Sequence, residues 1–254
     1  MSTLFDLHDR VAIVTGAGRG LGSGIAQALA DAGAQVVLVS RSEDQLETVQ
    51  AQITASGGAA QVLAWDLGEG TSAPDLVAQV VGQFGRLDVV VHAAGNMVRR
   101  PALDFPAADW DAVIGLHLRA AFLLAQATAR HLTTAGRGGS IILVGSLTSQ
   151  RVGIRDTVAY GSAKSGLMGL MRTLAVEWAP HGVRVNMIAP GFVPTALTAT
   201  VDDNPERRAL LARIPLGRPG TPEDLGGTAV FLASDASGYI TGEAITVDGG
   251  WSVA

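Results

Sequence analysis

The chain has 254 residues, of which 48% are hydrophobic and 16% are charged, and its formal net charge is −5. Since the basic residues form no block, we expect neither a nucleic acid nor an anionic membrane as a partner. The chain has no cysteine, which excludes disulfides, thiolate chemistry and cysteine-ligated zinc, and we expect no metal site. The N-terminus has no apolar segment typical of a signal peptide, and no apolar run approaches a membrane span, so we expect a cytoplasmic protein.

Short runs of β-branched residues alternate with longer helical patterns along the chain. Continuous apolar strands between helices predict a parallel sheet with helices on both faces, and right-handed crossovers then give a doubly wound Rossmann arrangement. We find no internal repeat or linker, so we expect a single α/β domain over residues 1–254. The seven expected strands are Val11–Val14, Gln35–Val39, Gln61–Trp65, Val89–His92, Ser140–Val144, Arg184–Ile188 and Ala244–Val247. The first three expected helices run to Leu29, over 43–55 and over 73–84.

A glycine-rich loop separates the first expected strand from its helix. Glycines at this point permit a tight turn and let backbone amides approach a pyrophosphate at the helix N-terminus. A merely flexible turn is the alternative, but the strand–loop–helix context favours nucleotide binding. The residues expected to hold the nucleotide are Gly16, Gly18, Arg19, Gly20, Leu21 and Gly22.

The end of the second strand carries no acidic residue, although an NAD-binding site usually offers one there to the ribose 2′-hydroxyl. Ser40 occupies that place, Arg41 follows it, and Arg19 lies in the glycine loop. Two guanidinium groups could pair with a 2′-phosphate, so we expect NADP(H), with NAD(H) as the alternative if both arginines are ordinary surface residues. Asp66, which Leu67 follows after the third strand, either contacts the adenine or is a solvated turn residue.

Tyr160 and Lys164 lie four residues apart in a helical pattern, which places their side chains on the same helix face. A phenol with a pKa of about 10 is a poor acid at neutral pH, and a neighbouring ammonium favours its ionised form. The pair is therefore a plausible proton-transfer centre. Taken alone, this spacing is more often found on a solvated helix surface, so the motifs upstream decide its interpretation.

Several further motifs occur in the order found in one known family. They are the glycine loop, Ala94-Gly95, Ser146, Tyr160, Lys164, the segment 190–195 and the segment 238–250. Together they resemble the short-chain dehydrogenase/reductase family over essentially the whole chain. The resemblance implies that Tyr160 is the general acid/base, that Lys164 binds the nicotinamide ribose and lowers the pKa of Tyr160, and that Ser146 hydrogen-bonds the reacting oxygen.

These implied roles suit hydride transfer, in which negative charge grows on a carbonyl oxygen that nearby hydroxyl groups can stabilise. Thr148 or Ser149 could supply the hydroxyl if Ser146 is only a turn residue. Small residues at Ala94 and Gly95 would let the chain pass close to the cofactor. The resemblance further implies that a last group of residues holds the nicotinamide carboxamide: Pro190, Gly191, Val193 and Thr195.

The chain departs from the family pattern in two places. His92 and Ala93 stand where two asparagines are common, and we expect His92 to be a satisfied core residue. His117 stands where the family usually has a catalytic asparagine that helps to hold a water in a proton relay, largely through its main-chain carbonyl. Histidine keeps that carbonyl, and its imidazole could titrate near neutral pH and relay protons itself. A purely structural role for His117 is the alternative.

The loop after Gly95 should border the substrate pocket. A double arginine before proline, Arg99 and Arg100, is similar to sugar-acid members of the family such as gluconate 5-dehydrogenases, and it could hold a carboxylate by a bidentate contact. We therefore expect a keto-gluconate or a similar sugar acid as substrate, although loop arginines are usually just solvated. The other residues expected near the substrate are Asn96, Arg151, Arg155 and Phe192.

The sequence also leaves two alternative functions open, and it suggests a substrate lid and an oligomer. An irregular, proline-containing segment at about 192–221 is a candidate substrate lid. A 3-oxoacyl-thioester reductase would need a longer apolar channel, to which Phe192, Leu197, Leu210 and Leu211 could contribute. A nucleotide-sensing or scaffold protein could keep the fold without the reaction, although Ser146, Tyr160 and Lys164 are all present. The resemblance also implies a homo-dimer or homo-tetramer built on the two longest helices and the C-terminal strand.

Overall fold

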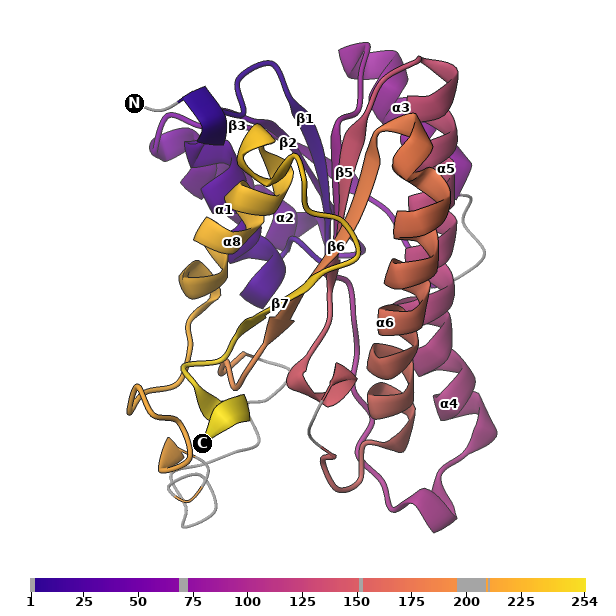
Figure 1. The fold of residues 1–254 in the computed structure, drawn as a ribbon, viewed down its shortest axis with the longest axis vertical. Coiled ribbons are helices and arrows are strands. Elements are labelled where there is room, and N and C mark those ends of the chain that lie inside the picture. The colour runs from indigo at the N-terminus through magenta and orange to yellow at the C-terminus, as the bar shows by residue number, and fades with distance from the viewer. Residues whose placement is uncertain (1–2, 69–72, 151–152, 196–208, 210) are drawn as a thin grey trace.

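The computed structural model describes residues 3–68, 73–150, 153–195, 209 and 211–254. At its centre lies one parallel sheet of seven strands (Figure 1). The strands are β1 (Val11–Thr15), β2 (Gln35–Ser40), β3 (Ala59–Ala64), β4 (Val89–His92), β5 (Gly139–Val144), β6 (Val183–Pro190) and β7 (Ala244–Val247). Their order across the sheet is β3-β2-β1-β4-β5-β6-β7. The sequence-based prediction of a doubly wound parallel sheet is thus confirmed.

Helices cover both faces of this sheet (Figure 1). They are α1 (Gly20–Asp31), α2 (Glu43–Ala55), α3 (Ala73–Phe84), α4 (Ala107–Ile114), α5 (Ala120–Thr134), α6 (Val158–Trp178) and α8 (Gly226–Ala233). One face carries α1, α2 and α8, and the other carries α3, α4, α5 and α6. Since both faces are covered, the central strands read as continuous apolar runs, and all five residues of β1 are buried.

The bounds of β1, β2 and β5 differ from the predicted ones by one residue at one end, and those of β3 and β6 differ at both ends. β3 begins at Ala59 rather than Gln61, because a turn through Gly57, whose φ is +88°, brings the chain directly into pairing with Gln35 of β2. β6 continues to Pro190, which pairs with Val247 of β7. Proline is tolerated there because it ends the strand.

One long helical run crosses from α4 to α5 through a π-helical segment, Gly115–Arg119. Its residues 107–134 have a mean hydropathy of 1.4 over an 18-residue window, so this is the one described helix that is long and apolar enough to cross a membrane. Our statement that no run approaches a membrane span was therefore too strong. Half of the window is buried in the fold, because α5 packs against α3 and the sheet. Packing in the core of the fold therefore explains why the buried half of this window is apolar.

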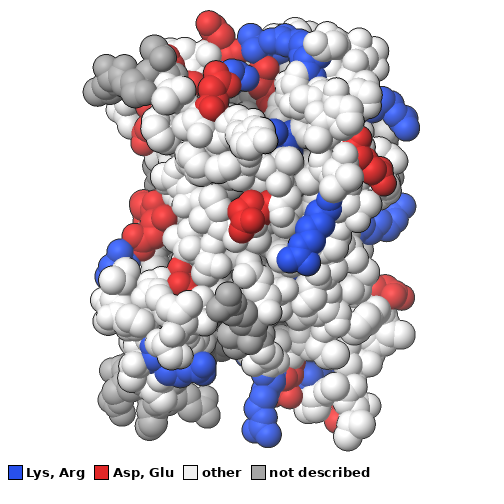
Figure 2. Space-filling view, in the orientation of Figure 1, with Lys and Arg blue, Asp and Glu red and all other residues white. Residues whose placement is uncertain are grey.

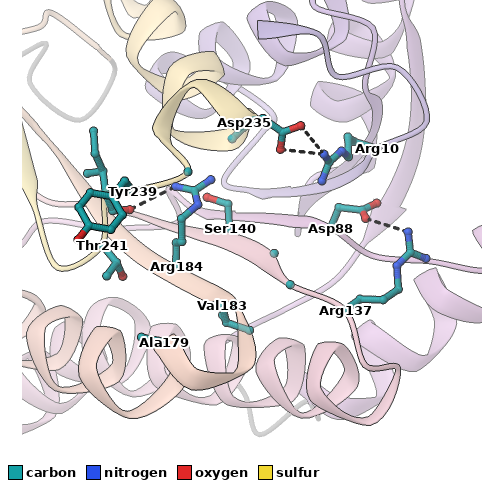
Figure 3. A pocket seen from close by; sticks show the side chains of 16 residues that line it. Arg10, Asp88, Arg137, Ser140, Ala179, Val183, Arg184, Asp235, Tyr239 and Thr241 are labelled. Carbon is teal, nitrogen blue, oxygen red and sulfur yellow. Dashed lines mark hydrogen bonds and ion pairs between the residues drawn. The ribbon is translucent and has the colours of Figure 1, made fainter. Parts of the chain in front are cut away.

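Charged side chains of both signs are interspersed over the face seen in Figure 2, without a block of one sign. At the amino ends of the strands, a hollow of about 860 Å³ is lined by charged groups that already have protein partners (Figure 3). Buried Asp88 accepts the Val11 amide and pairs with Arg86 and Arg137. Arg184 donates to carbonyl groups that include those of Leu232 and Ser234. These charged groups hold neighbouring chain segments at the amino ends of the strands. We therefore expect a ligand site at the opposite, carboxyl edge of the sheet, where open α/β sheets bind their ligands.

Candidate active site

A cavity of about 440 Å³ opens at the carboxyl edge of the sheet, next to the ends of β1 and β4. This is the point where the strand order reverses direction, which is where open α/β sheets bind their ligands. Most residues that the sequence predicted for the cofactor line this cavity, together with His117, predicted for catalysis, and Asn96, predicted for the substrate. They are Gly16, Gly18, Arg19, Gly20, Leu21, Gly22, Ser40, Arg41, Asp66, Leu67, Ala94, Gly95, Asn96, His117, Tyr160, Lys164 and Thr195.

Two glycines of the loop after β1 are required by space. A Cβ on Gly16 would lie 2.9 Å from backbone atoms of Ala93 and Ala94, and its φ of +65° is also left-handed. A Cβ on Gly22 would lie 2.2 Å from the Gly16 carbonyl oxygen. The loop therefore lies flat against the β4 end and leads into the N-terminus of α1. Amides at a helix N-terminus attract a phosphate, so this cradle fits a dinucleotide pyrophosphate.

Thr15 completes this cradle, and the sequence analysis missed it. Its buried Oγ1 accepts hydrogen bonds from the amides of Ala93 and Ala94, both at 3.1 Å. The side chain of the last β1 residue thus holds the loop after β4 in place. A polar residue that ends an otherwise apolar strand was the available signal, because a buried hydroxyl needs a partner.

The far end of the cavity holds Ser40 and Arg41 at the end of β2, and Asp66 after β3. The Asp66 carboxylate accepts the Gly68 amide at 2.7 Å, and it lies 3.9 Å from Nη1 of exposed Arg41. Asp66 is therefore engaged in its own turn, while the Arg41 guanidinium remains largely in solvent. Arg19 is also exposed at this cavity. Two cations at one rim fit an additional phosphate group.

Ser146 and Tyr160 face each other at the other end of the site. Burial raises the pKa of Tyr160, whereas a hydrogen bond with Ser146 and the positive charge of Arg99 lower it. Ser146 also accepts the Thr148 amide, and Ser149 accepts the amide of Ser146, so this turn is capped at both ends. Thr148 and Ser149 do not replace Ser146 as the partner of Tyr160. The structure thus supports our preference for Ser146.

Lys164 is buried on α6, and its Nζ donates to the Val144 carbonyl oxygen at 2.6 Å. The same nitrogen lies 5.7 Å from the centre of the Tyr160 ring. Burial lowers the pKa of Lys164 to about 7. The lowering of the Tyr160 pKa that the resemblance implies for Lys164 does not prevail here, since the net shift of that pKa is upward. The reason is that desolvation acts on both groups and favours the neutral form of each.

The two departures from the family pattern are both buried. His92 contacts Thr15 Oγ1 at 3.3 Å and the Leu116 carbonyl oxygen at 3.2 Å, and burial lowers its pKa to about 3. It is a satisfied core residue, as predicted. Burial, together with the charge of Lys164, lowers the pKa of His117 to about 2. Of the two roles left open for His117, this burial favours the structural one over an imidazole that titrates near neutral pH.

The two arginines of the substrate loop have different partners. The Arg100 amide donates to the Asp156 carbonyl oxygen, and the Arg100 guanidinium lies 3.4 Å from Asp109 of α4. Arg99 is exposed, and its charge acts on Tyr160. Arg155 is also exposed, and Arg99, Arg100 and Arg155 all lie outside the cavity lining. Only Arg99 of these three is thus connected electrostatically to the proton-transfer centre, and Arg151 lies outside the described residues.

The segment after β6 is held beside the site by apolar contacts of Phe192. Phe192 packs with Leu147, Leu211, Ile214 and Trp251, so it and Leu211 do not line the open cavity. Gly191 is pressed against Asp248, where a Cβ would meet backbone at 2.7 Å.

Two further groups of predicted residues belong to this segment. Pro190 and Val193 are buried and lie outside the cavity lining. Leu197 and Leu210 fall outside the described residues, as do all residues of the predicted lid from 196 to 208. Among the residues that are described, no three His, Cys, Asp or Glu side chains gather to form a metal site.

Comparisons with known proteins agree with this geometry. The protein-family model described as Enoyl-(Acyl carrier protein) reductase matches residues 16–252. The chain is 44% identical to the 2-dehydro-3-deoxy-D-gluconate 5-dehydrogenase of Escherichia coli (strain K12), over 97% of both proteins. It is 37% identical to the D-threitol dehydrogenase of Mycolicibacterium smegmatis, over 98% of this chain and 95% of that protein.

A solved structure shows the same architecture. The gluconate 5-dehydrogenase from Burkholderia cenocepacia J2315, in complex with NADP and tartrate, superposes with a TM-score of 0.92. It is 33% identical, and the match covers 99% of this chain and 98% of that chain. The likeness thus extends over nearly all of both chains.

Lys164 is the only lysine in the sequence, so its titration can be observed directly. In protein labelled with ¹³C-lysine and free of ligand, we expect one ¹³Cε resonance that titrates at about 7 instead of 10.5. The unfolded chain then binds the additional proton between these two values, so stability should rise with pH across that window. Thermal unfolding at a series of pH values checks this, and Lys164→Met, the matched control, should lack this component. A resonance midpoint near 10.5 would contradict the burial that we describe.

Proposed function

The chain belongs to the short-chain dehydrogenase/reductase family, and we propose that it is an NADP(H)-dependent oxidoreductase that interconverts a ketone and a secondary alcohol of a sugar acid. The observation that carries the proposal is the grouping of Ser146, Tyr160 and Lys164 at one end of a nucleotide cradle, with Arg99 acting on Tyr160. When bound, the nicotinamide cofactor supplies or accepts the hydride. The residues of this chain then have to manage one proton and the charge on one oxygen.

In the direction of reduction, the ketone carbon gains a hydride and its oxygen gains the proton of the Tyr160 hydroxyl. The Ser146 hydroxyl donates a hydrogen bond to the same oxygen, which stabilises the negative charge that grows there. Lys164 Nζ lies 5.7 Å from the centre of the Tyr160 ring, and in its ammonium form it stabilises the tyrosinate that is left behind. Proton transfer of this kind contributes about 10²- to 10⁴-fold to a rate.

Arg99 supports a substrate that carries a carboxylate. It is an exposed guanidinium whose charge reaches Tyr160, whereas Arg100 is paired with Asp109. A carboxylate bound by Arg99 would place a carbonyl group of the same small molecule within reach of Tyr160. The relatives named above include a dehydrogenase of a keto-deoxy sugar acid and one solved with tartrate. The relative that is a D-threitol dehydrogenase makes a neutral polyol the alternative substrate to test.

The cofactor preference rests on the end of β2. Ser40 leaves that position without a carboxylate, and Arg41 and Arg19 leave two exposed cations at the rim. This arrangement suits a 2′-phosphate better than a bare ribose, because a guanidinium pairs with phosphate oxygens in a fork. One solved relative holds NADP. We propose that NADP(H) binds more tightly than NAD(H).

We also propose a homo-oligomer built on the outer faces of α4, α5 and α6. Added Cβ atoms on Gly161 and Gly169 of α6 would meet nothing within 4 Å, so the fold of one chain does not require glycine there. Val176 on the same helix is 77% exposed. Half of the apolar window in the run 107–134 is not buried in one chain. A second copy of this surface would cover these residues, and light scattering of a monomer at micromolar concentration would oppose the proposal.

The activity is tested by NADPH oxidation with a panel of keto sugar acids, neutral keto sugars and 3-oxoacyl thioesters. We expect turnover with a sugar acid, and Tyr160→Phe should lower kcat/KM by about 10²- to 10⁴-fold, since it removes the hydroxyl group that carries the transferable proton. Its dissociation constant for NADPH should change by no more than a few-fold, as measured by fluorescence titration. Tight NADPH binding by the native chain without turnover of any ketone would favour a nucleotide-sensing protein.

Arg99→Ala should raise KM for the sugar acid by about 10- to 100-fold, because a charge-assisted hydrogen bond contributes about 1.5–3 kcal/mol. Arg100→Ala is the matched control, and KM should change little, because Arg100 is paired with Asp109. Steady-state kinetics with a neutral ketone of similar size provide the second comparison. Equal losses for the acid and the neutral ketone would contradict the carboxylate contact.

Arg41→Ala should weaken NADPH by about tenfold, which corresponds to one lost charged contact of about 1.4 kcal/mol, and NADH much less. Binding titrations with both cofactors, without substrate, measure this difference. Because Asp66 lies near Arg41, the same titrations with Asp66→Asn show whether that carboxylate competes for the guanidinium. Equal weakening of NADPH and NADH by Arg41→Ala would oppose a 2′-phosphate contact.

A further inference from the structure

His117 contacts both the proton-transfer centre and the substrate loop. It lies in the π-helical segment between α4 and α5 and is 1% exposed. Its ring meets the Tyr160 ring edge-on, with 5.4 Å between centroids and an angle of 86° between planes. Its Nε2 lies 2.7 Å from the Asn96 carbonyl oxygen and 3.0 Å from the Asn96 amide nitrogen. One imidazole thus fixes the distance between Tyr160 and the Asn96 peptide.

Gly95 is matched in size to this imidazole. A Cβ on Gly95 would lie 2.4 Å from Cε1 of His117, and its three nearest atoms all belong to the His117 ring. Gly95 is not among the described glycines with a left-handed φ, so backbone conformation does not demand glycine here. With His117 in place, the imidazole occupies the space that a side chain at position 95 would need.

The contacts of His117 do not suit a proton carrier. The partner of its Nε2 is a peptide group, and a peptide group cannot pass a proton onward at neutral pH. The shorter contact, to the carbonyl oxygen, favours the tautomer with hydrogen on Nε2. The neighbouring titratable groups also favour a neutral imidazole. The charge of Lys164 on α6 lowers the pKa of His117, and burial keeps His92 of β4 neutral.

We propose that His117 is a positioning residue: as a neutral imidazole it holds the Gly95–Asn96 peptide against Tyr160, and Gly95 is its steric complement. The substrate loop that follows Asn96 carries Arg99, so His117 sets where that guanidinium stands relative to the Tyr160 hydroxyl. This last consequence rests on the proposed function, whereas the fit between His117 and Gly95 does not. Substituting either residue should therefore affect the other position more than the proton chemistry.

Two substitutions separate positioning from proton relay. Glutamine can place an amide nitrogen where Nε2 lies, whereas asparagine reaches only to the position of Nδ1. We expect His117→Asn to raise substrate KM by about tenfold, the loss of one positioned contact, with a smaller change in kcat. His117→Gln should recover much of the loss, and the pH profile of kcat should keep its shape in both variants. Loss of the same ionisation from both pH profiles would overturn the proposal in favour of a relay.

A double-mutant cycle tests the steric pair without any substrate. Gly95→Ala should lower the unfolding temperature in the native background, because its methyl group meets the imidazole. The same change should be much less harmful in His117→Asn, whose shorter side chain leaves room, so the two effects should be non-additive. Additive effects would overturn the proposed fit. If the cycle is non-additive but no ketone is reduced, the fit stands and only the proposed activity fails.

NMR of ¹⁵N-histidine-labelled protein gives an independent readout of the charge on His117. Its ring nitrogens, assigned by comparison with His117→Gln, should keep the shifts of a neutral Nε2–H tautomer from pH 5 to pH 9 (a window of about four units around the ordinary histidine value). Free ¹⁵N-histidine in a matched sample provides the titrating control. Protonation of His117 within this range would overturn the proposal.

Discussion

The carboxyl ends of β1 and β4 approach so closely that backbone fills the space between them, and the site is arranged around this contact. No side chain fits on Gly16, and Thr15 uses its one hydroxyl oxygen to hold two amides of the neighbouring loop. Because connections leave these two strands in opposite directions across the sheet, a crevice must open directly above them. The glycine loop forms one wall of the crevice, and α6 brings Tyr160 and Lys164 to the other.

Burial sets the charge state of the proton-transfer pair before any ligand arrives. It raises the pKa of Tyr160 and lowers that of Lys164 to about 7, so the free protein favours a neutral phenol and a partly neutral amine. A negative group placed beside Lys164 shifts its equilibrium towards the ammonium, because an opposite charge favours the charged form. The tyrosinate that proton transfer leaves behind is such a negative group, so it favours the ammonium form of Lys164. The charge on Lys164 is thus coupled electrostatically to the loss of the proton from Tyr160.

The sequence predicted the strands, the glycine loop and the grouping of Ser146, Tyr160 and Lys164, because each leaves a local pattern. It could not separate Arg99 from Arg100, since only the placement of Asp109 on α4 shows which guanidinium is already paired. It also missed the π-helical segment at 115–119, because a single wide turn leaves no periodicity signal in an apolar helix. The resemblance implied a lowered pKa for Tyr160, whereas the net shift is upward. Helix spacing identifies Lys164 as a neighbour of Tyr160, but it does not show how far the two side chains are removed from water.

The departure at position 117 is better understood as a change that the surrounding structure accommodates than as an isolated loss. Histidine is larger than asparagine, and the imidazole of His117 occupies space beside Gly95 that a Cβ at position 95 would need. Its second nitrogen-bearing edge then reaches a peptide group that asparagine cannot reach. Burial keeps the larger ring neutral, so it gains a contact without adding a charge beside Lys164. A substitution that looks like the loss of a relay residue in the sequence thus becomes, in three dimensions, a rigid support for Tyr160.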